Sequence, residues 1–198
     1  MPVLIGKNRV NVRRSSAGDR CISGMTMLLK LLFALANAAA LPAAGTYDYT
    51  LVPDSSDDVK GAVNHTVEHM GFFTRPIARK RLNRLNPIPH HMQVTITADS
   101  LSVVFDSLNA MVTPLNGAEV SWQSAITKDD VYQIHAVQQG DTLSQVISAG
   151  DGERTNAYLF DEGSGRVALH VTLASHRLPR PLEYTLVFRR DSTVMSSR

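Results

Sequence analysis

The chain has 198 residues, of which 43% are hydrophobic and 19% are charged, with a formal net charge of +2 and one cysteine. This composition excludes a disordered chain, a multi-span membrane protein and a disulfide-stabilised scaffold, and the length suffices for one domain with its own core. The first 44 residues hold six basic residues and one acidic residue, so the remainder has a net charge of −3. Whole-chain charge therefore gives no argument for nucleic acid as a partner.

Residues 1–44 have the features of a secretory leader. Lys30 precedes a short apolar run, Leu31–Ala36, and small residues follow it. The run is too short for a transmembrane helix but suits the apolar core of a signal peptide. We expect cleavage near Ala40–Ala44 and a mature protein that is not membrane-spanning and is periplasmic or secreted, in a bacterium.

The leader is long for a signal peptide, which indicates that the true start is Met25 or Met27. Cys21 lies in this leader, so the mature chain has no cysteine. The mature protein therefore has neither disulfides nor thiol chemistry, and its stability must come from packing.

The first elements of the mature chain are predicted to be one strand and a helical segment at about 56–86. Gly45–Val52 alternates as a strand does. Ser55 is a candidate N-cap, with Asp58 three residues later. An apolar stripe at helical spacing follows, and Gly71 is the expected stop: Val59, Val63, Val67 and Met70.

A second helix is expected from Thr74 to Leu85, ending before a proline. Phe72 and Phe73, just before it, are expected to pack down as a plug. One face of the helix is apolar (Ile77, Ala78, Leu82 and Leu85), and basic residues cover most of the other: Arg75, Arg79, Lys80 and Arg84. These four basic residues are a candidate interaction patch for an anionic surface or an acidic partner; the alternative is a solvated face of a helix that caps the fold.

The rest of the chain reads as a series of strands joined by short turns. Expected strands are 92–97, 101–107, 110–112, 118–123, 131–137, 143–148, 154–161, 166–174 and 183–190. Alternation is clearest where apolar side chains repeat every second residue: Val167, Leu169, Val171, Leu173, and then Tyr184, Leu186, Phe188. Leu169, Val171, Leu173, Leu186 and Phe188 are expected to be buried, and Arg166, His170 and Glu183 exposed.

About nine strands in a meander predict closure into a barrel, because closure removes the sheet edges. The expected fold is a mainly β, antiparallel up-and-down barrel, lipocalin-like, over residues 45–198, with a short helical insert after the first strand. The interior of such a barrel holds side chains or one small ligand.

The mature chain resembles a family of small exported bacterial proteins with lipocalin-like barrels. The resemblance rests on Ser56-Asp57-Asp58 after the first strand, on Phe73–Arg79, and on the ending Arg177–Tyr184. It implies a fold and an exported location, and it implies no activity.

His65-Thr66-Val67-Glu68-His69 matches H-x-x-E-H, the zinc motif of one class of metallopeptidases. Two histidines four residues apart can share a metal, and a glutamate can act as general base. Helical geometry, however, places His65, Glu68 and His69 opposite the apolar stripe, on a polar face without supporting groups. Only His90 and His91 could approach if the second helix doubled back.

The interpretation favoured by the sequence is a barrel that binds a small apolar or amphipathic molecule, or one with a structural role in the cell envelope. We expect no catalytic residues, no cofactor-binding residues and no metal site. Two alternatives stay open: a zinc-dependent hydrolase using residues 65–69, and a surface-interaction module acting through the basic helix 75–84. A binding barrel should contain a cavity of roughly 300 Å³ or more, whereas a structural one should be filled.

Overall fold

The computed structural model describes residues 41–191 except 107, 128–129 and 151. Cys21 and nearly all of the predicted leader lie outside the described residues, so the expectations of cleavage, start site and export stay predictions. The described residues contain ten strands: β1 (Gly45–Leu51), β2 (His91–Ile96), β3 (Ser100–Phe105), β4 (Met111–Pro114), β5 (Val120–Gln123), β6 (Val131–Gln139), β7 (Thr142–Ala149), β8 (Gly152–Asp161), β9 (Arg166–Ser175) and β10 (Leu182–Arg190).

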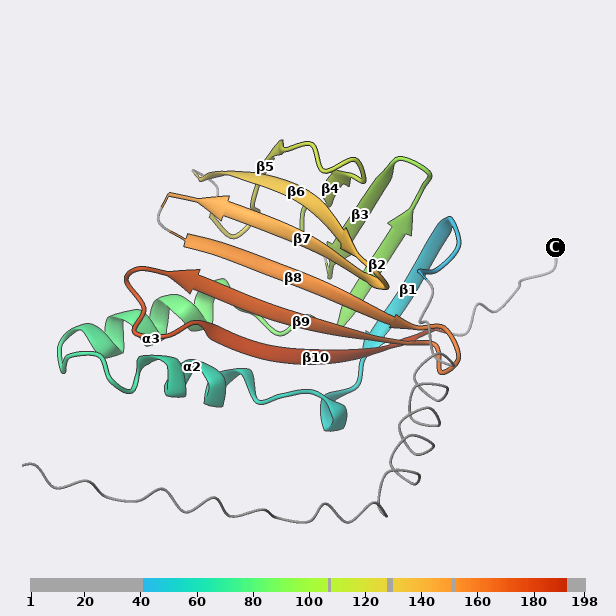
Figure 1. Cartoon of the computed structure of the whole chain (residues 1–198). Coiled ribbons are helices and arrows are strands. Elements are labelled where there is room, and N and C mark those ends of the chain that lie inside the picture. Colours follow the sequence, from blue (N-terminus) through green and yellow to red (C-terminus); the bar gives the residue numbers. More distant parts are fainter. Residues whose placement is uncertain (1–40, 107, 128–129, 151, 192–198) are drawn as a thin grey trace, which may run out of the picture. The chain divides into compact units, whose positions relative to one another are not determined.

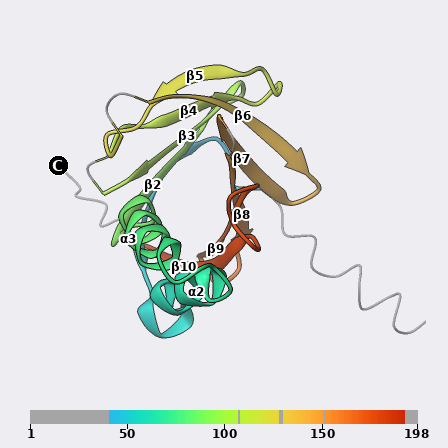
Figure 2. The same cartoon turned by 90° about the vertical axis from the view of Figure 1, so that its left-hand side faces the viewer.

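The strands form one antiparallel sheet in the order β4-β3-β2-β1-β10-β9-β8-β7-β6-β5. The sheet curls on itself, so that β4 comes into contact with β6 (Figure 2). Between β1 and β2 the chain forms η1 (Pro53–Ser55), α2 (Val59–Val67) and α3 (Thr74–Leu85). The predicted fold class, a mainly β barrel with a helical insert after the first strand, is thus confirmed (Figure 1).

Strand alternation separates the interior from the exterior of the barrel, as the sequence predicts. Leu169, Val171, Leu186 and Phe188 are each at most 2% exposed. Arg166, His170 and Glu183 lie outside and are exposed. Leu173 is only half-buried, because its side chain lines an internal cavity rather than the packed core.

Two hairpin glycines show why the turns need this residue. Gly140, between β6 and β7, has φ +61°, and Gly165, between β8 and β9, has φ +63°. A side chain strains the backbone in this left-handed region. At the second turn, the Asp161 carboxylate also accepts hydrogen bonds from the backbone N–H groups of Gly163 and Ser164.

Helix α2 packs along β10 through its apolar stripe (Figure 1). Val59, Val63 and Val67 are at most 2% exposed. The expected N-cap at Ser55 is wrong: Ser55 belongs to η1, and the carboxylate of Asp58 accepts the capping hydrogen bond from Lys60 N. Because Asp57 exchanges hydrogen bonds with the backbone of Thr185 on β10, the chain stays extended until residue 58.

The turn between α2 and α3 contradicts the expectation of an aromatic plug. Phe72 is 85% exposed and Phe73 is 82% exposed. Helix α2 ends at Val67, before the expected stop at Gly71, so these two residues do not continue its buried face. Thr74 does not cap α3 through its side chain, which instead donates to the Gly71 carbonyl at 3.1 Å.

A buried polar seam joins the edge strand β4 to the interior strands β7 and β8. Gln145 on β7 is fully buried, and its Nε2 donates to the Met111 carbonyl on β4 at 2.9 Å. The Tyr158 hydroxyl donates to Gln145 Oε1 at 3.0 Å. Burial raises the pKa of Tyr158, so the phenol stays protonated and remains a donor. Side chains thus close the barrel beside β4, where the sheet order ends.

Candidate ligand cavity

One end of the barrel contains a partly open cavity of about 930 Å³. Helix α3 forms one wall, and the segments joining β3 to β4, β5 to β6, β7 to β8 and β9 to β10 surround it. Most of the lining side chains are apolar, among them Leu82, Phe105, Trp122, Ile147, Leu169 and Leu186. The volume falls in the range of small-molecule sites, and it exceeds what a filled barrel would leave.

Arg154 on β8 is the polar centre of this cavity. Its guanidinium donates to Asn156 Oδ1 at 2.8 Å and to Asn86 Oδ1 at 3.0 Å. The Tyr184 hydroxyl donates to the same Asn86 oxygen at 3.2 Å. Asn86 itself is 3% exposed and is anchored by a hydrogen bond from its Nδ2 to the Leu82 carbonyl. Arg154 is therefore held in place by neutral groups that leave its positive charge uncompensated.

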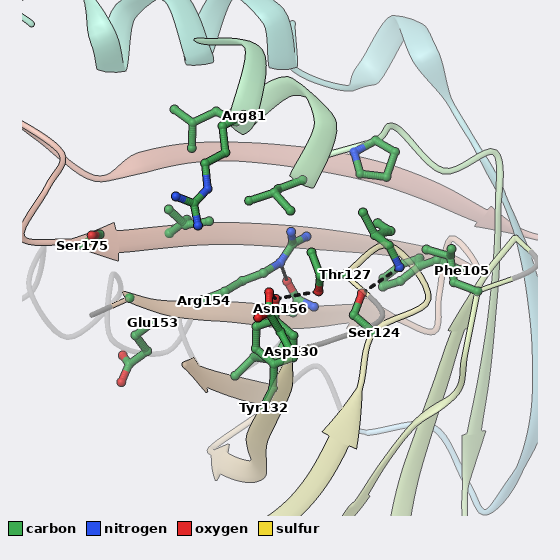
Figure 3. A pocket seen from close by; sticks show the side chains of 18 of the residues that line it. Arg81, Phe105, Ser124, Thr127, Asp130, Tyr132, Glu153, Arg154, Asn156 and Ser175 are labelled. Carbon is green, nitrogen blue, oxygen red and sulfur yellow. Dashed lines mark hydrogen bonds between the residues drawn. The ribbon is translucent and has the colours of Figure 1, made fainter. Parts of the chain in front are cut away.

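Arg81 brings a second guanidinium to the same space. Its side chain extends from α3 toward the cavity, into which Arg154 projects from β8 (Figure 3). Arg154 is half-buried and Arg81 is exposed, and both border a mainly apolar space, so an anion between them would be stabilised by two opposite charges.

The acidic residues of the cavity wall are engaged elsewhere or directed away. The Asp106 carboxylate accepts hydrogen bonds from the backbone N–H groups of His90 and His91. Asp130 accepts a hydrogen bond of 3.4 Å from the Tyr132 hydroxyl. Glu153 points away from Arg154 at the rim (Figure 3). Among the described residues, no hydrogen bond or ion pair joins a carboxylate to Arg154.

The sequence interpretation did not identify Arg154, Asn156, Asn86 or Tyr184 as site residues. For the strand residues a signal was present: Arg154 and Asn156 share the inward face of β8 with Tyr158 and Phe160 under a period of two. Arg154 precedes the inward-facing Asn156 by two residues and the inward-facing Tyr158 by four. This spacing indicates that the charge of Arg154 lies inside the barrel. For Asn86 no local pattern was available, because it follows a helix and its burial depends on tertiary packing.

The H-x-x-E-H residues lie together, exposed, at the end of α2 and outside the cavity lining. The Glu68 carboxylate lies 3.3 Å from His65 Nδ1 and 3.0 Å from His69 Nε2. Arg180, from the segment between β9 and β10, donates to Glu68 at 3.0 Å. Desolvation raises the pKa of Glu68, but the charges of His65, Arg180 and His69 outweigh it and hold this pKa below its ordinary value.

The guanidinium of Arg180 contacts both Glu68 and His65, two of the groups that a zinc ion would need. Arg180 contacts His65 Nε2 through its second terminal nitrogen. His91 begins β2 and His90 precedes it, and the backbone N–H groups of both donate to the Asp106 carboxylate. Within the part of the chain that the structure describes, no three His, Cys, Asp or Glu side chains are grouped to hold a metal ion.

The four basic residues of the candidate interaction patch lie on α3 but are not equivalent. Arg79, Lys80 and Arg84 are exposed. Arg75 is half-buried, and its guanidinium donates to the Met70 carbonyl at 3.1 Å. The patch therefore reduces to three solvent-facing cations, whereas Arg75 stabilises the turn between the helices.

The fold and cavity define the class of this protein: a small antiparallel β-barrel with an internal cavity next to a helical insert. No protein-family model and no curated protein matches the sequence. Solved structures do resemble it: a mutant of the REP1-NXSQ fatty acid transporter, at 15% identity over 75% of this chain and 97% of that chain, has a TM-score of 0.46. "Human cRBP IV", at 17% identity over 76% of this chain and all 100% of that chain, has a TM-score of 0.45.

A fatty-acid-binding protein 1 of Echinococcus granulosus is similar too, at 6% identity over 75% of this chain and 97% of that chain, with a TM-score of 0.47. Similarity at these levels carries no argument about what the present chain binds. In residues 41–191, as far as they are described, no helix combines the length and apolarity that a membrane crossing requires.

Proposed function

We propose that this protein binds one small amphipathic molecule with an anionic head group inside its barrel, and that it is not an enzyme. The observation that carries the proposal is the cavity of about 930 Å³ with Arg154 as its polar centre. The volume favours a binding barrel over the structural alternative, for which a filled interior is expected.

The chemistry of the walls supports an amphipathic ligand. An apolar body would cover side chains such as Leu169 and Ile147, which face the cavity. A carboxylate, sulfonate or phosphate head would accept hydrogen bonds from Arg154, whose planar guanidinium matches such anions. Asn86 and Asn156 hold Arg154 in position before the ligand arrives, so little ordering accompanies binding.

The test uses matched ligands that differ in charge. Anilinonaphthalene sulfonate, an anionic fluorescent probe, should bind with one-to-one stoichiometry, and laurate should displace it at lower concentration than dodecanol. Charge-assisted hydrogen bonds contribute about 1.5–3 kcal/mol, so Arg154→Met should weaken laurate binding by roughly 10–100-fold and leave dodecanol binding nearly unchanged. Arg166→Met, an exposed site on β9, is the matched control and should change neither.

Filling the cavity provides the second arm. Leu173→Trp places a bulky ring against the lining and should weaken probe binding while the circular dichroism spectrum stays native. Probe binding of unchanged affinity in Leu173→Trp, or laurate binding insensitive to Arg154→Met, would contradict the proposal.

A periplasmic or secreted location of this binding protein is also our proposal. Its support is the sequence of residues 30–44 alone. Mass spectrometry of the protein from its native host should find an N-terminus near Ala40–Ala44; an intact leader on a cytoplasmic protein would contradict it.

A further inference from the structure

The turn between α2 and α3 presents an apolar surface that nothing among the described residues covers. Phe72, Phe73 and Ile77 are 85%, 82% and 70% exposed. The two phenyl rings pack only on each other, edge to face, with centroids 5.3 Å apart. Full burial of one such side chain is worth about 1.5–3 kcal/mol, so leaving two adjacent rings in water forgoes a large stabilisation.

Basic residues follow this apolar surface along α3. Helix α3 contains five basic residues and no acidic residue. Lys80, Arg81 and Arg84 follow Ile77 at three, four and seven positions, so they lie on the same side of the helix as Ile77. Within the described residues, no hydrogen bond or ion pair engages the side chains of Lys80 or Arg84.

The same turn lies at the cavity. Thr74, Ile77 and Arg81 line the cavity with one face of α3. In Figure 1 the turn projects beyond the ends of β9 and β10, so no strand shields it from an approaching flat surface. The exposed aromatic pair, the cations and the mouth of the cavity therefore occupy one end of the barrel.

We propose that Phe72, Phe73, Ile77, Lys80 and Arg84, together termed the docking tip, bind the surface of an anionic lipid bilayer. The apolar residues enter the boundary between head groups and acyl chains, and the two cations contact the anionic head groups. Aromatic side chains favour this boundary, and Lys or Arg residues near an anionic membrane strengthen binding independently of any pocket.

Charge and shape favour a bilayer over other occupants. A second copy of the chain would bring one five-cation helix against another, which like-charge repulsion opposes. The rings stand on a projecting turn rather than in a groove, so a soft surface that accepts them matches better than a rigid one. The proposal goes beyond ligand binding in the cavity and does not depend on what the cavity holds.

The first measurement is co-sedimentation of the full chain with vesicles of phosphatidylcholine alone and of equimolar phosphatidylcholine and phosphatidylglycerol. Binding should require the anionic lipid and weaken with salt. Phe72→Ser/Phe73→Ser should lower the partition coefficient at least about 10-fold. Lys80→Gln/Arg84→Gln should lower it roughly 25-fold, whereas Arg166→Gln/Arg189→Gln, two exposed positions on β9 and β10, should lower it far less.

The second measurement uses tryptophan fluorescence to test whether the turn between α2 and α3 enters the bilayer, independently of contacts that other segments make with the vesicle. Phe72→Trp adds an indole that brominated phosphatidylglycerol vesicles should quench strongly. Leu159→Trp, on the outer barrel wall where Leu159 is 45% exposed, is the matched control and should show no added quenching.

Three results would overturn the proposal. The first is equal binding to neutral and anionic vesicles, and the second is an indole at position 72 that brominated lipid does not quench. The third is a lipid-free dimer in analytical ultracentrifugation that Phe72→Ser/Phe73→Ser converts to monomer, which would make the turn an interface between copies. Loss of laurate binding in Arg154→Met with intact vesicle binding would separate this proposal from that of the cavity.

Discussion

The two ends of the barrel use arginine in opposite ways. At the end that holds the β8–β9 turn, Arg190 lies 4.2 Å from the centroid of the Tyr47 ring and donates to Glu162 at 2.8 Å. At the cavity end, the guanidinium of Arg154 has neutral hydrogen-bond partners. A compensated arginine closes the packed end, whereas an uncompensated one leaves a site that an anion can complete.

The interiors of the two ends also differ in how tightly their side chains are packed. Toward the packed end, Tyr49, Tyr158, Phe160, Val167 and Phe188 are at most 2% exposed and do not line the cavity. Toward the cavity end, the walls include half-buried side chains such as Leu173 and Leu178. Stability should therefore reside mainly in the packed end, and binding in the other.

The largest expected effect separates the two interiors directly. Phe188→Ala should lower the free energy of unfolding by roughly 3–5 kcal/mol, because it opens a cavity in a packed region. Leu173→Ala, at a wall that already borders empty space, should lower it by only about 1 kcal/mol. Urea unfolding followed by circular dichroism measures both. Equal losses would mean that the two ends are packed alike.

The second-largest loss of stability is expected from the polar seam beside β4. Gln145→Leu leaves the Met111 carbonyl and the Tyr158 hydroxyl without their buried partner, so the free energy of unfolding should fall by about 1–3 kcal/mol. Gln139→Leu, at the exposed end of β6, should change it by less than about 0.5 kcal/mol. A Gln145→Leu variant as stable as its control would show that the seam does not stabilise closure.

Substitution of Arg190 or of Arg154 should change the free energy of unfolding by smaller amounts, which differ between the two residues. Arg190→Met loses the ring contact and the pair with Glu162, with a side chain 28% exposed, and should lower the free energy of unfolding by about 1 kcal/mol. Arg154→Met should leave it within about 0.5 kcal/mol, because Arg154 is only half-buried and a cation without a counter-ion contributes little to stability. A greater loss at Arg154 would assign that residue a structural role.

The smallest effect concerns pH at the cavity end. The pKa of Glu68 is lowered from 4.5 in the folded protein, so the stability that this carboxylate contributes is present above the unfolded value and is lost as the pH falls through the folded one. The difference in unfolding free energy between the wild type and Glu68→Gln should therefore shrink as the pH drops from 7 toward 3. A difference that is constant over this range would mean that Arg180 does not stabilise the Glu68 carboxylate.

Local pattern was enough for most of the scaffold. The alternation of Val167, Leu169 and Val171 placed β9 and its buried face correctly, and the stripe of Val59, Val63 and Val67 placed the buried face of α2. The estimate of about nine strands is one below the ten observed, although every observed strand overlaps a predicted range, including β4, which was expected at 110–112. The boundary of α2 was misplaced because Asp57 and Ser56 bind β10, a contact between residues far apart in the sequence.

What the sequence by itself determined is the alternation of apolar and polar residues, and with it the strands, the turns and the inner face of the barrel. Only the tertiary structure decided where the interior stays empty, that Arg154 meets Asn86 across 68 positions, and that Arg180 reaches Glu68 across 112. It also decided that Phe72 and Phe73 face water, against their hydrophobicity. Periodicity depends on neighbouring residues, whereas cavities, paired charges and uncovered aromatic rings depend on which distant segments meet.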